Sequence, residues 1–199
     1  MPAESKYARV ELERRFLLDR FPDQANVTRL RRIEDRYIEG TTLRLRQQRD
    51  DGDQSVFKLT QKLPDKAPGA KQGLVTTIYL TPAEFGALEK LPAKVLRKSR
   101  YTIPPFGIDV FAGELSGLVL AEAEFHSAAE ATTLALPSFI GPEVSDDSRF
   151  TGGQLVAVSR DELRTWLAQY GINLDYEARA TATAGNRVNA LTIIPTEKQ

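Results

Sequence analysis

The segment Glu11-Leu-Glu-Arg-Arg15, inside the run from Val10 to Leu18, decides how this chain folds. The run has the periodicity of a β-strand, in which successive side chains point to opposite faces. Glu11, Glu13 and Arg15 then share one face, and most of the other face is apolar. Two carboxylates about 7 Å apart beside a guanidinium can hold a divalent metal and an anion together. A solvated strand face has the same pattern, so the segment alone leaves both interpretations open.

The same alternation recurs in five further segments, each of which places charged side chains together on one face of the strand. They are 42–46 with Arg44 and Arg46, 56–62 with Lys58, Thr60 and Lys62, 96–103 with Lys98 and Arg100, 108–111 with Asp109, and 118–125 with Glu122 and Glu124. An open, half-buried sheet would expose such charges to bulk solvent. A closed barrel with a charged lumen, an apolar outside and covering helices explains all six segments together.

The remaining segments show patterns of secondary structure without a clear functional pattern. Residues 29–38 and 74–80 have the character of further strands, and 50–53 that of a hairpin turn. Residues 63–73 are expected to form a mobile loop at the mouth of the barrel. Thr81-Pro-Ala-Glu84 and Ser159-Arg-Asp-Glu162 carry the capping-box pattern that begins a helix, and 127–134 is expected to form a short helix. The Arg29–Arg32 run is interpreted as an exposed strand end, with a nucleic-acid patch as the alternative.

Taken in order, the motifs resemble one family. Glu-x-Glu-x-Arg, Leu-Arg-Leu-Arg, Lys-x-Thr-x-Lys, Arg-Lys-Ser-Arg-Tyr, Asp-Val-Phe-x-Gly and Ala-Glu-x-Glu are similar to those of the CYTH superfamily, the triphosphate tunnel metalloenzymes. The matches run from about residue 10 to about residue 155. The resemblance implies an α+β fold, an eight-stranded antiparallel β-barrel with flanking helices, whose tunnel binds a triphosphate compound with divalent metal. We expect one such domain over 1–172, followed by a partly disordered tail over 173–199.

A triphosphate in such a tunnel needs opposite charge around it, because an uncompensated buried ion is costly. The expected phosphate-binding residues are Arg15, Arg44, Arg46, Lys58, Lys62, Lys98, Arg100 and Arg149, the last from a likeness of residues 143–152 to the family's closing segment. The carboxylates would repel the substrate unless hard cations intervene, and Mg²⁺ or Mn²⁺ is the natural choice. The expected metal ligands are Glu11, Glu13, Asp109, Glu122 and Glu124.

The chain also departs from the family pattern. Arg15 stands where lysine is usual, and because arginine stays protonated it can hold phosphate but is a poor base. With Arg15, Lys98 is the expected catalytic residue, and proton removal falls to Lys98 or to a metal-bound hydroxide. Residues 75–78 lack the usual charged side chains, and Phe150 and Gly152 stand where tyrosine and asparagine are usual.

Composition narrows the function further. The 199 residues contain 27 Lys and Arg against 27 Asp and Glu, a balance that argues against a general nucleic-acid binder. Without cysteine the chain has neither disulfides nor thiolate metal sites. The sequence begins without a signal-like apolar stretch and has no apolar run long enough for a membrane helix, so we expect a cytoplasmic location and no membrane partner. We also expect a monomer or homodimer without a nucleic-acid partner.

Two enzyme classes fit these residues. The favoured function is metal-dependent hydrolysis of the terminal phosphate of a triphosphate compound, inorganic triphosphate before a nucleoside or thiamine triphosphate. The alternative is a class IV-like adenylate cyclase, which would need an adenine pocket that no motif identifies. A non-catalytic polyphosphate- or nucleotide-binding module is disfavoured by the carboxylates.

Overall fold

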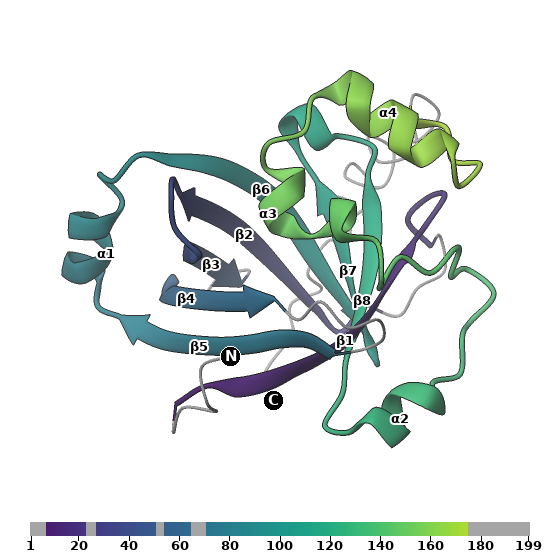
Figure 1. Ribbon diagram of the computed structural model, residues 1–199, viewed down its shortest axis with the longest axis horizontal. Helices are drawn as coiled ribbons and strands as arrows, with labels where there is room; N and C mark the ends of the chain where they lie inside the picture. Colours follow the sequence, from purple (N-terminus) through teal and green to yellow (C-terminus); the bar gives the residue numbers. More distant parts are fainter. Residues whose placement is uncertain (1–6, 23–26, 51–53, 65–70, 175–199) are drawn as a thin grey trace, which may run out of the picture.

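Eight strands close into one antiparallel barrel (Figure 1). The computed structural model describes residues 7–22, 27–50, 54–64 and 71–174. The strands are β1 (Arg9–Leu17), β2 (Arg29–Ile38), β3 (Leu43–Asp50), β4 (Val56–Pro64), β5 (Lys71–Leu80), β6 (Ala93–Ile103), β7 (Phe106–Phe111) and β8 (Val119–Glu124). Around the barrel they follow the order β1-β5-β4-β3-β2-β6-β7-β8. The predicted eight-stranded antiparallel barrel is therefore confirmed.

Short helices connect and cover the barrel. They are α1 (Pro82–Leu88), α2 (Ala128–Thr132), α3 (Gly152–Leu155) and α4 (Arg160–Ala168), with 3₁₀ turns η1 (Gly113–Leu115) and η2 (Ser148–Phe150). The capping boxes predicted at Thr81 and Ser159 are both present, each with the serine or threonine side chain accepting from the backbone N–H three residues on. None of the described helices is long and apolar enough to cross a membrane.

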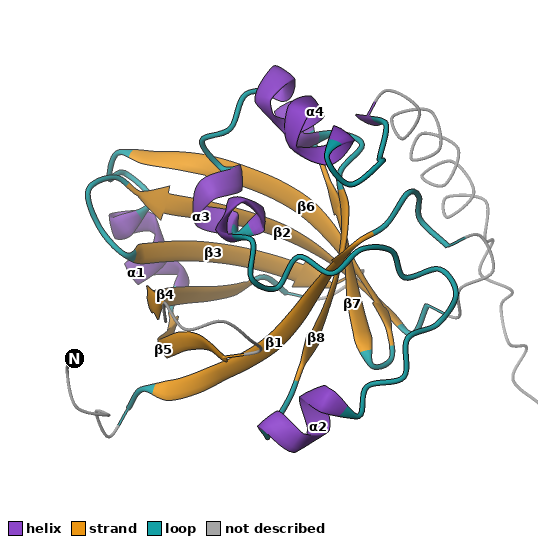
Figure 2. Ribbon diagram, turned by 45° about the vertical axis from the view of Figure 1, so that its right-hand side comes forward, coloured by secondary structure: helices purple, strands orange, loops and turns teal. Residues whose placement is uncertain are grey.

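An apolar plug closes one end of the barrel. Leu17, Leu96, Phe111 and Leu120 lie on the same face of their strands as the charged residues but further toward this end, and all are at most 5% exposed. They pack against side chains of η2, α3 and α4, and Figures 1 and 2 show these helices gathered over the same end of the strands. The charged part of the inner face is thus left toward the opposite end.

The outer face of the barrel is apolar on only one side. On β1, β7 and β8 it carries Phe16, Ile108 and Ala121, which are fully buried beneath a layer that includes Phe139 and Ile140. On β2 and β6 the outer face is charged, with Arg97 Nε donating to Glu34 Oε2 at 2.8 Å. The prediction of an apolar outside is therefore wrong for these two strands, whose outer-face charges pair with each other at a partly exposed surface.

Some predicted segments lie partly outside the described residues. The expected mouth loop falls largely on 65–70 and the expected hairpin turn on 51–53, neither of which is described, while β4 runs to Pro64 and β5 starts at Lys71. Most of the expected tail, 175–199, is likewise outside them. Leu174 is fully buried in the plug, two residues beyond the end we expected for the domain.

Candidate active site

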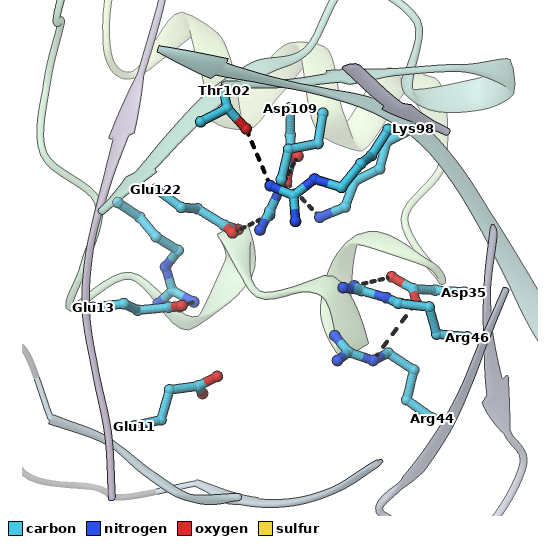
Figure 3. Close-up of polar contacts among 12 residues, drawn as sticks. Glu11, Glu13, Asp35, Arg44, Arg46, Lys98, Thr102, Asp109 and Glu122 are labelled. Atoms are coloured by element: carbon cyan, nitrogen blue, oxygen red, sulfur yellow. Dashed lines mark hydrogen bonds and ion pairs between the residues drawn. The ribbon is translucent and has the colours of Figure 1, made fainter. Parts of the chain in front are cut away.

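A wall of carboxylates lines the lumen where β1 meets β8. The two strands pair so that Glu13 lies opposite Glu124, and Arg15 opposite Glu122. Because side chains alternate along a strand, Glu11, Glu13, Glu122 and Glu124 all belong to the inner face. Figure 3 shows Glu11, Glu13 and Glu122 on the same side of the lumen. The predicted acidic positions on these two strands are therefore brought together.

The carboxylates of this wall differ in how readily they ionise. Burial, with help from the neighbouring Glu122 and Glu11 carboxylates, raises the pKa of Glu13 to about 7. Burial acts on Glu122 in the same direction, but the cations Arg100 and Lys98 outweigh it and hold the pKa of Glu122 well below its ordinary value. Glu11 is paired with Lys62, whose Nζ lies 2.8 Å from both Glu11 oxygens. At Glu13, burial and the neighbouring carboxylates thus outweigh the nearby cations Lys62 and Arg15.

A basic wall faces the carboxylates from β3. Arg46 donates to Asp35 from Nε at 2.6 Å and from Nη2 at 2.7 Å, and Arg44 Nε lies 3.6 Å from the same carboxylate. Burial raises the pKa of Asp35, but the two guanidiniums outweigh it and hold that pKa well below its usual range. Figure 3 places Arg44, Arg46 and Asp35 across the lumen from Glu11 and Glu13. The arginines are therefore fixed in place, pointing toward the opposite wall.

Lys58 on β4 continues this wall. It pairs with Arg46 in register, and its Nζ lies 5.2 Å from the centre of the Tyr79 ring. Burial, followed by repulsion from Arg46, Arg31 and Arg44, lowers the pKa of Lys58. The basic wall thus carries more positive charge than its own carboxylates neutralise, which is the condition for binding an anion.

Asp109, predicted as a metal ligand, is in contact with two cations. It is fully buried, and both of its oxygens accept from Arg100, at 2.6 Å each, while Lys98 also donates to it. Arg100 donates to Glu122 as well. A carboxylate enclosed by two cations orients them. These contacts position Lys98 and Arg100, and the role of Asp109 as a metal ligand stays a prediction.

Arg15 lies between the acidic wall and the closed end. Its Nη1 lies 3.3 Å from Glu13 Oε1, and its Nη2 donates to the carbonyl oxygen of Ser145 at 2.9 Å. The Ser145 hydroxyl in turn accepts from the Arg15 backbone N–H at 3.0 Å. The side chain is buried and held on both sides, so its guanidinium has one orientation toward the lumen.

Arg149 does not join the lumen residues. It lies in a surface pocket of about 620 Å³, where its Nη2 donates to Asp147 at 2.6 Å and its Nη1 to Gln169 at 2.9 Å. The same guanidinium lies over the Trp166 ring. The prediction that Arg149 contacts phosphate came from a loop motif, which has no periodicity to indicate the direction of a side chain. In the structure the loop directs this side chain toward α4. We leave Arg149 out of the site.

Three inner-face residues of β2 were missed from the sequence. Arg31, Asp35 and Tyr37 pair with Asp50, Arg46 and Arg44 of β3, all inner-face positions. Burial, followed by the charge of Asp35, raises the pKa of Tyr37 to about 12. Alternation alone could not find these residues, because β2 carries charged side chains on both faces. Pairing with the clearer β3 pattern was the signal that would have identified them.

The acidic wall suits a hard divalent cation. No three His, Cys, Asp or Glu side chains among the described residues are close enough to form an all-protein metal cage. Mg²⁺ is usually held by one or two carboxylates together with substrate phosphates and water, so such a cage is not required. The raised pKa of Glu13 marks a place where added positive charge would relieve repulsion between carboxylates. The donor set and its charge therefore fit a metal that arrives with its anionic substrate.

Comparison with known proteins agrees with this geometry. No family profile matches the chain. An inorganic triphosphatase from Nitrosomonas europaea is 33% identical over 151 residues, which cover 70% of this chain and 92% of the relative. The chain belongs to the CYTH superfamily of triphosphate tunnel metalloenzymes.

Solved structures resemble this CYTH protein as well. The crystal structure of the hypothetical protein NE1496 has a TM-score of 0.50 and 28% identity, covering 75% of this chain and 99% of the other. A structure described as the inorganic triphosphatase NE1496 has a TM-score of 0.49 and 27% identity, covering 74% and 95% of the two chains. In this family the lumen of the barrel is the tunnel.

Proposed function

We propose that this CYTH protein hydrolyses the terminal phosphate of inorganic triphosphate in a reaction that needs a divalent metal. One observation carries the proposal: the tunnel holds an acidic wall and, across from it, a basic wall with surplus positive charge. A metal alone would satisfy only the first wall, and a metal-free anion only the second. A triphosphate with its metal satisfies both. The named relative, an inorganic triphosphatase, supports the same reaction class.

Glu11, Glu13, Glu122 and Glu124 are the residues we assign to hold the metal, as Mg²⁺ or Mn²⁺. When bound, the metal supplies Lewis-acid stabilisation of phosphate oxygens and activation of water. The protein's part is to keep these carboxylates on one wall. Because the pKa of Glu13 is raised to about 7, this carboxylate is partly protonated near neutral pH, and positive charge beside it would favour its ionised form.

The cations orient the substrate and stabilise charge that develops on the transferred phosphate. We assign this role to Arg15, Arg44, Arg46, Lys58, Lys62, Lys98 and Arg100. Arginine contacts phosphate oxygens in a bidentate manner, whereas lysine acts as a point charge. Asp35 and Asp109 hold four of these side chains in position before substrate arrives. The tunnel therefore needs little rearrangement on binding.

Lys98 and Arg15 are the residues we assign closest to the reacting phosphate. Arg15 remains protonated and is anchored by Glu13 and Ser145, so it holds a phosphate oxygen without exchanging its proton. Lys98, beside Asp109, is the group that contacts the attacking water or the terminal phosphate. Lys98→Ala should therefore abolish turnover, as should Glu13→Ala.

The test uses the purified full-length chain with inorganic triphosphate or ATP, in Mg²⁺ or Mn²⁺ and after chelation. Release of orthophosphate that requires metal supports the proposal. Formation of cyclic AMP and pyrophosphate from ATP would identify a cyclase instead and sink it. Glu13→Gln should lose activity. Glu34→Gln is the matched control, because Glu34 lies on the outer face of β2, and this variant should keep its activity.

A cytoplasmic location and a monomer or homodimer remain predictions from the sequence.

A further inference from the structure

Arg31 extends the basic wall toward the open end of the tunnel. On β2 it lies four residues from Asp35, on the side away from Tyr37, which packs against the apolar plug. It pairs with Arg100 of β6 and Asp50 of β3, both on the inner face. Its Nη2 donates to the Thr102 hydroxyl at 3.1 Å. Figure 3 shows the Thr102 side chain pointing into the lumen, where its hydroxyl accepts this hydrogen bond.

The Arg31 guanidinium is only partly satisfied. Its Nε is buried and has no hydrogen-bond partner in the described part of the chain. Of the carboxylates whose charge reaches Arg31, Asp109 is engaged by Lys98 and Arg100, whereas Asp50, among the described residues, accepts from Arg29 through Oδ2 and makes no hydrogen bond to Arg31. A buried donor without an acceptor is costly, so its retention needs a reason. An anionic oxygen arriving from the tunnel would supply the acceptor.

Lys58 is a second cation on which the charge of Arg31 acts, although its register partner Arg46 lies opposite Asp35 rather than Arg31. On β4 it is four residues from Lys62, again toward the open end, since β2 and β4 run in the same direction. Burial and then Arg100 lower the pKa of Arg31, and burial followed by Arg46 and Arg31 lowers that of Lys58. Arg31 and Lys58 are therefore each repelled by neighbouring cations, and an anion bound beside them would relieve this repulsion.

We propose that Arg31 and Lys58 form a subsite for the phosphate nearest the tunnel mouth, and that this subsite favours inorganic triphosphate over nucleoside triphosphates. The inference rests on the proposed function, which puts the phosphate to be cleaved at the acidic wall. The far phosphate of inorganic triphosphate is terminal and has two ionisable oxygens. In a nucleoside triphosphate the corresponding phosphate is esterified and has only one. Two surplus cations attract the former more strongly.

The test compares kcat and KM for inorganic triphosphate and ATP in wild type, Arg31→Gln and Arg31→Lys. Losing a charge-assisted contact should lower kcat/KM for inorganic triphosphate by roughly tenfold or more, mainly through KM. The loss for ATP should be smaller, so the preference between the two substrates changes. Arg31→Lys should recover part of the loss. Arg32→Gln, on the outer face of the same strand, is the control and should leave both substrates unchanged.

Two outcomes would overturn the inference: equal losses for both substrates, or no loss for either. Calorimetric binding of inorganic triphosphate without metal gives a second measurement that does not depend on turnover, and Arg31→Gln should weaken it while Arg32→Gln does not. If wild type hydrolyses no triphosphate, the proposed function fails, and this binding comparison still decides whether Arg31 holds the anion.

Discussion

The Asp35 carboxylate accepts two hydrogen bonds from Arg46 inside the tunnel, at 2.6 and 2.7 Å. Asp35 is 1% exposed and also pairs with Arg44. Asp35→Asn keeps the shape but leaves two buried guanidiniums without a counter-charge, which should cost roughly 3–5 kcal/mol of folding stability.

Inorganic triphosphate should restore much of that loss, because it binds the folded state and supplies the missing negative charge. The melting temperature with and without triphosphate measures both effects. Asp161→Asn is the control, since Asp161 is an exposed partner of Arg164 and should contribute little. A variant as stable as wild type without anion would contradict the prediction.

Tyr37 and Gly152 meet where the barrel is closed. A Cβ at position 152 would lie 2.0 Å from the Tyr37 hydroxyl oxygen, so no larger residue fits beside that side chain. Gly152→Ala should destabilise the protein by roughly 1–3 kcal/mol.

Combining Gly152→Ala with Tyr37→Phe should cost less than the sum of the two single changes, because the clashing oxygen is gone. Urea denaturation of the four proteins in the cycle measures the coupling. Strictly additive costs would show that the two residues do not compete for this space.

The barrel was predictable because its inner charges recur at strand spacing in segments whose opposite face is apolar. On β1, β3, β4 and β8 the alternation alone selects the inner face. On β2 it fails, since Arg32 and Glu34 on the outer face are as polar as Arg31 and Asp35 on the inner one. Only the pairing with β3 and β6 resolves the ambiguity, and pairing between distant segments is not visible in one strand's pattern.

The pairing of Asp109 with two cations could not be derived for a related reason. Its alternation predicts an inner-face carboxylate correctly, but whether a carboxylate meets a metal or a cation depends on what lies across from it. Register brings Arg100 opposite Asp109, and Lys98 two residues along the same strand. The direction of the Arg149 side chain could not be predicted either, because a loop lacks the periodicity that fixes side-chain direction in a strand.

Arg14 and Arg15 are neighbours with opposite surroundings. Arg14 lies on the outer face and pairs with Glu143 through hydrogen bonds of 2.9 and 2.6 Å, whereas Arg15 is buried in the tunnel beside Glu13. Arg14→Gln should cost about 1 kcal/mol of stability or less and leave kcat/KM for inorganic triphosphate unchanged. Arg15→Gln should lower it by roughly a hundredfold or more. Steady-state kinetics of both variants measure these changes in kcat/KM. Similar losses in the two variants would contradict the different roles assigned to Arg14 and Arg15.

Glu13 makes the stability of the metal-free protein depend on pH. Its pKa rises from an ordinary 4.5 to about 7 on folding, so the folded state binds more protons than the unfolded state between these values. Stability from this group is fully present below about pH 4.5 and is lost as pH rises through about 7. The lowered pKa values of Asp35 and Glu122 act below this window, where protonation of those groups destabilises the fold.

Glu13→Gln removes the titrating group and keeps its shape, so it should flatten the decline between pH 5 and 8 and make the metal-free protein more stable than wild type at pH 8, by up to about 3 kcal/mol. Urea denaturation in the presence of a chelator, at several pH values, measures the slope. Glu34→Gln should leave the wild-type slope intact, because that carboxylate is partly exposed on the outer face. An unchanged slope in Glu13→Gln would show that another group takes up the proton on folding. Glu13 would then no longer be the carboxylate at which a bound metal is expected to relieve repulsion.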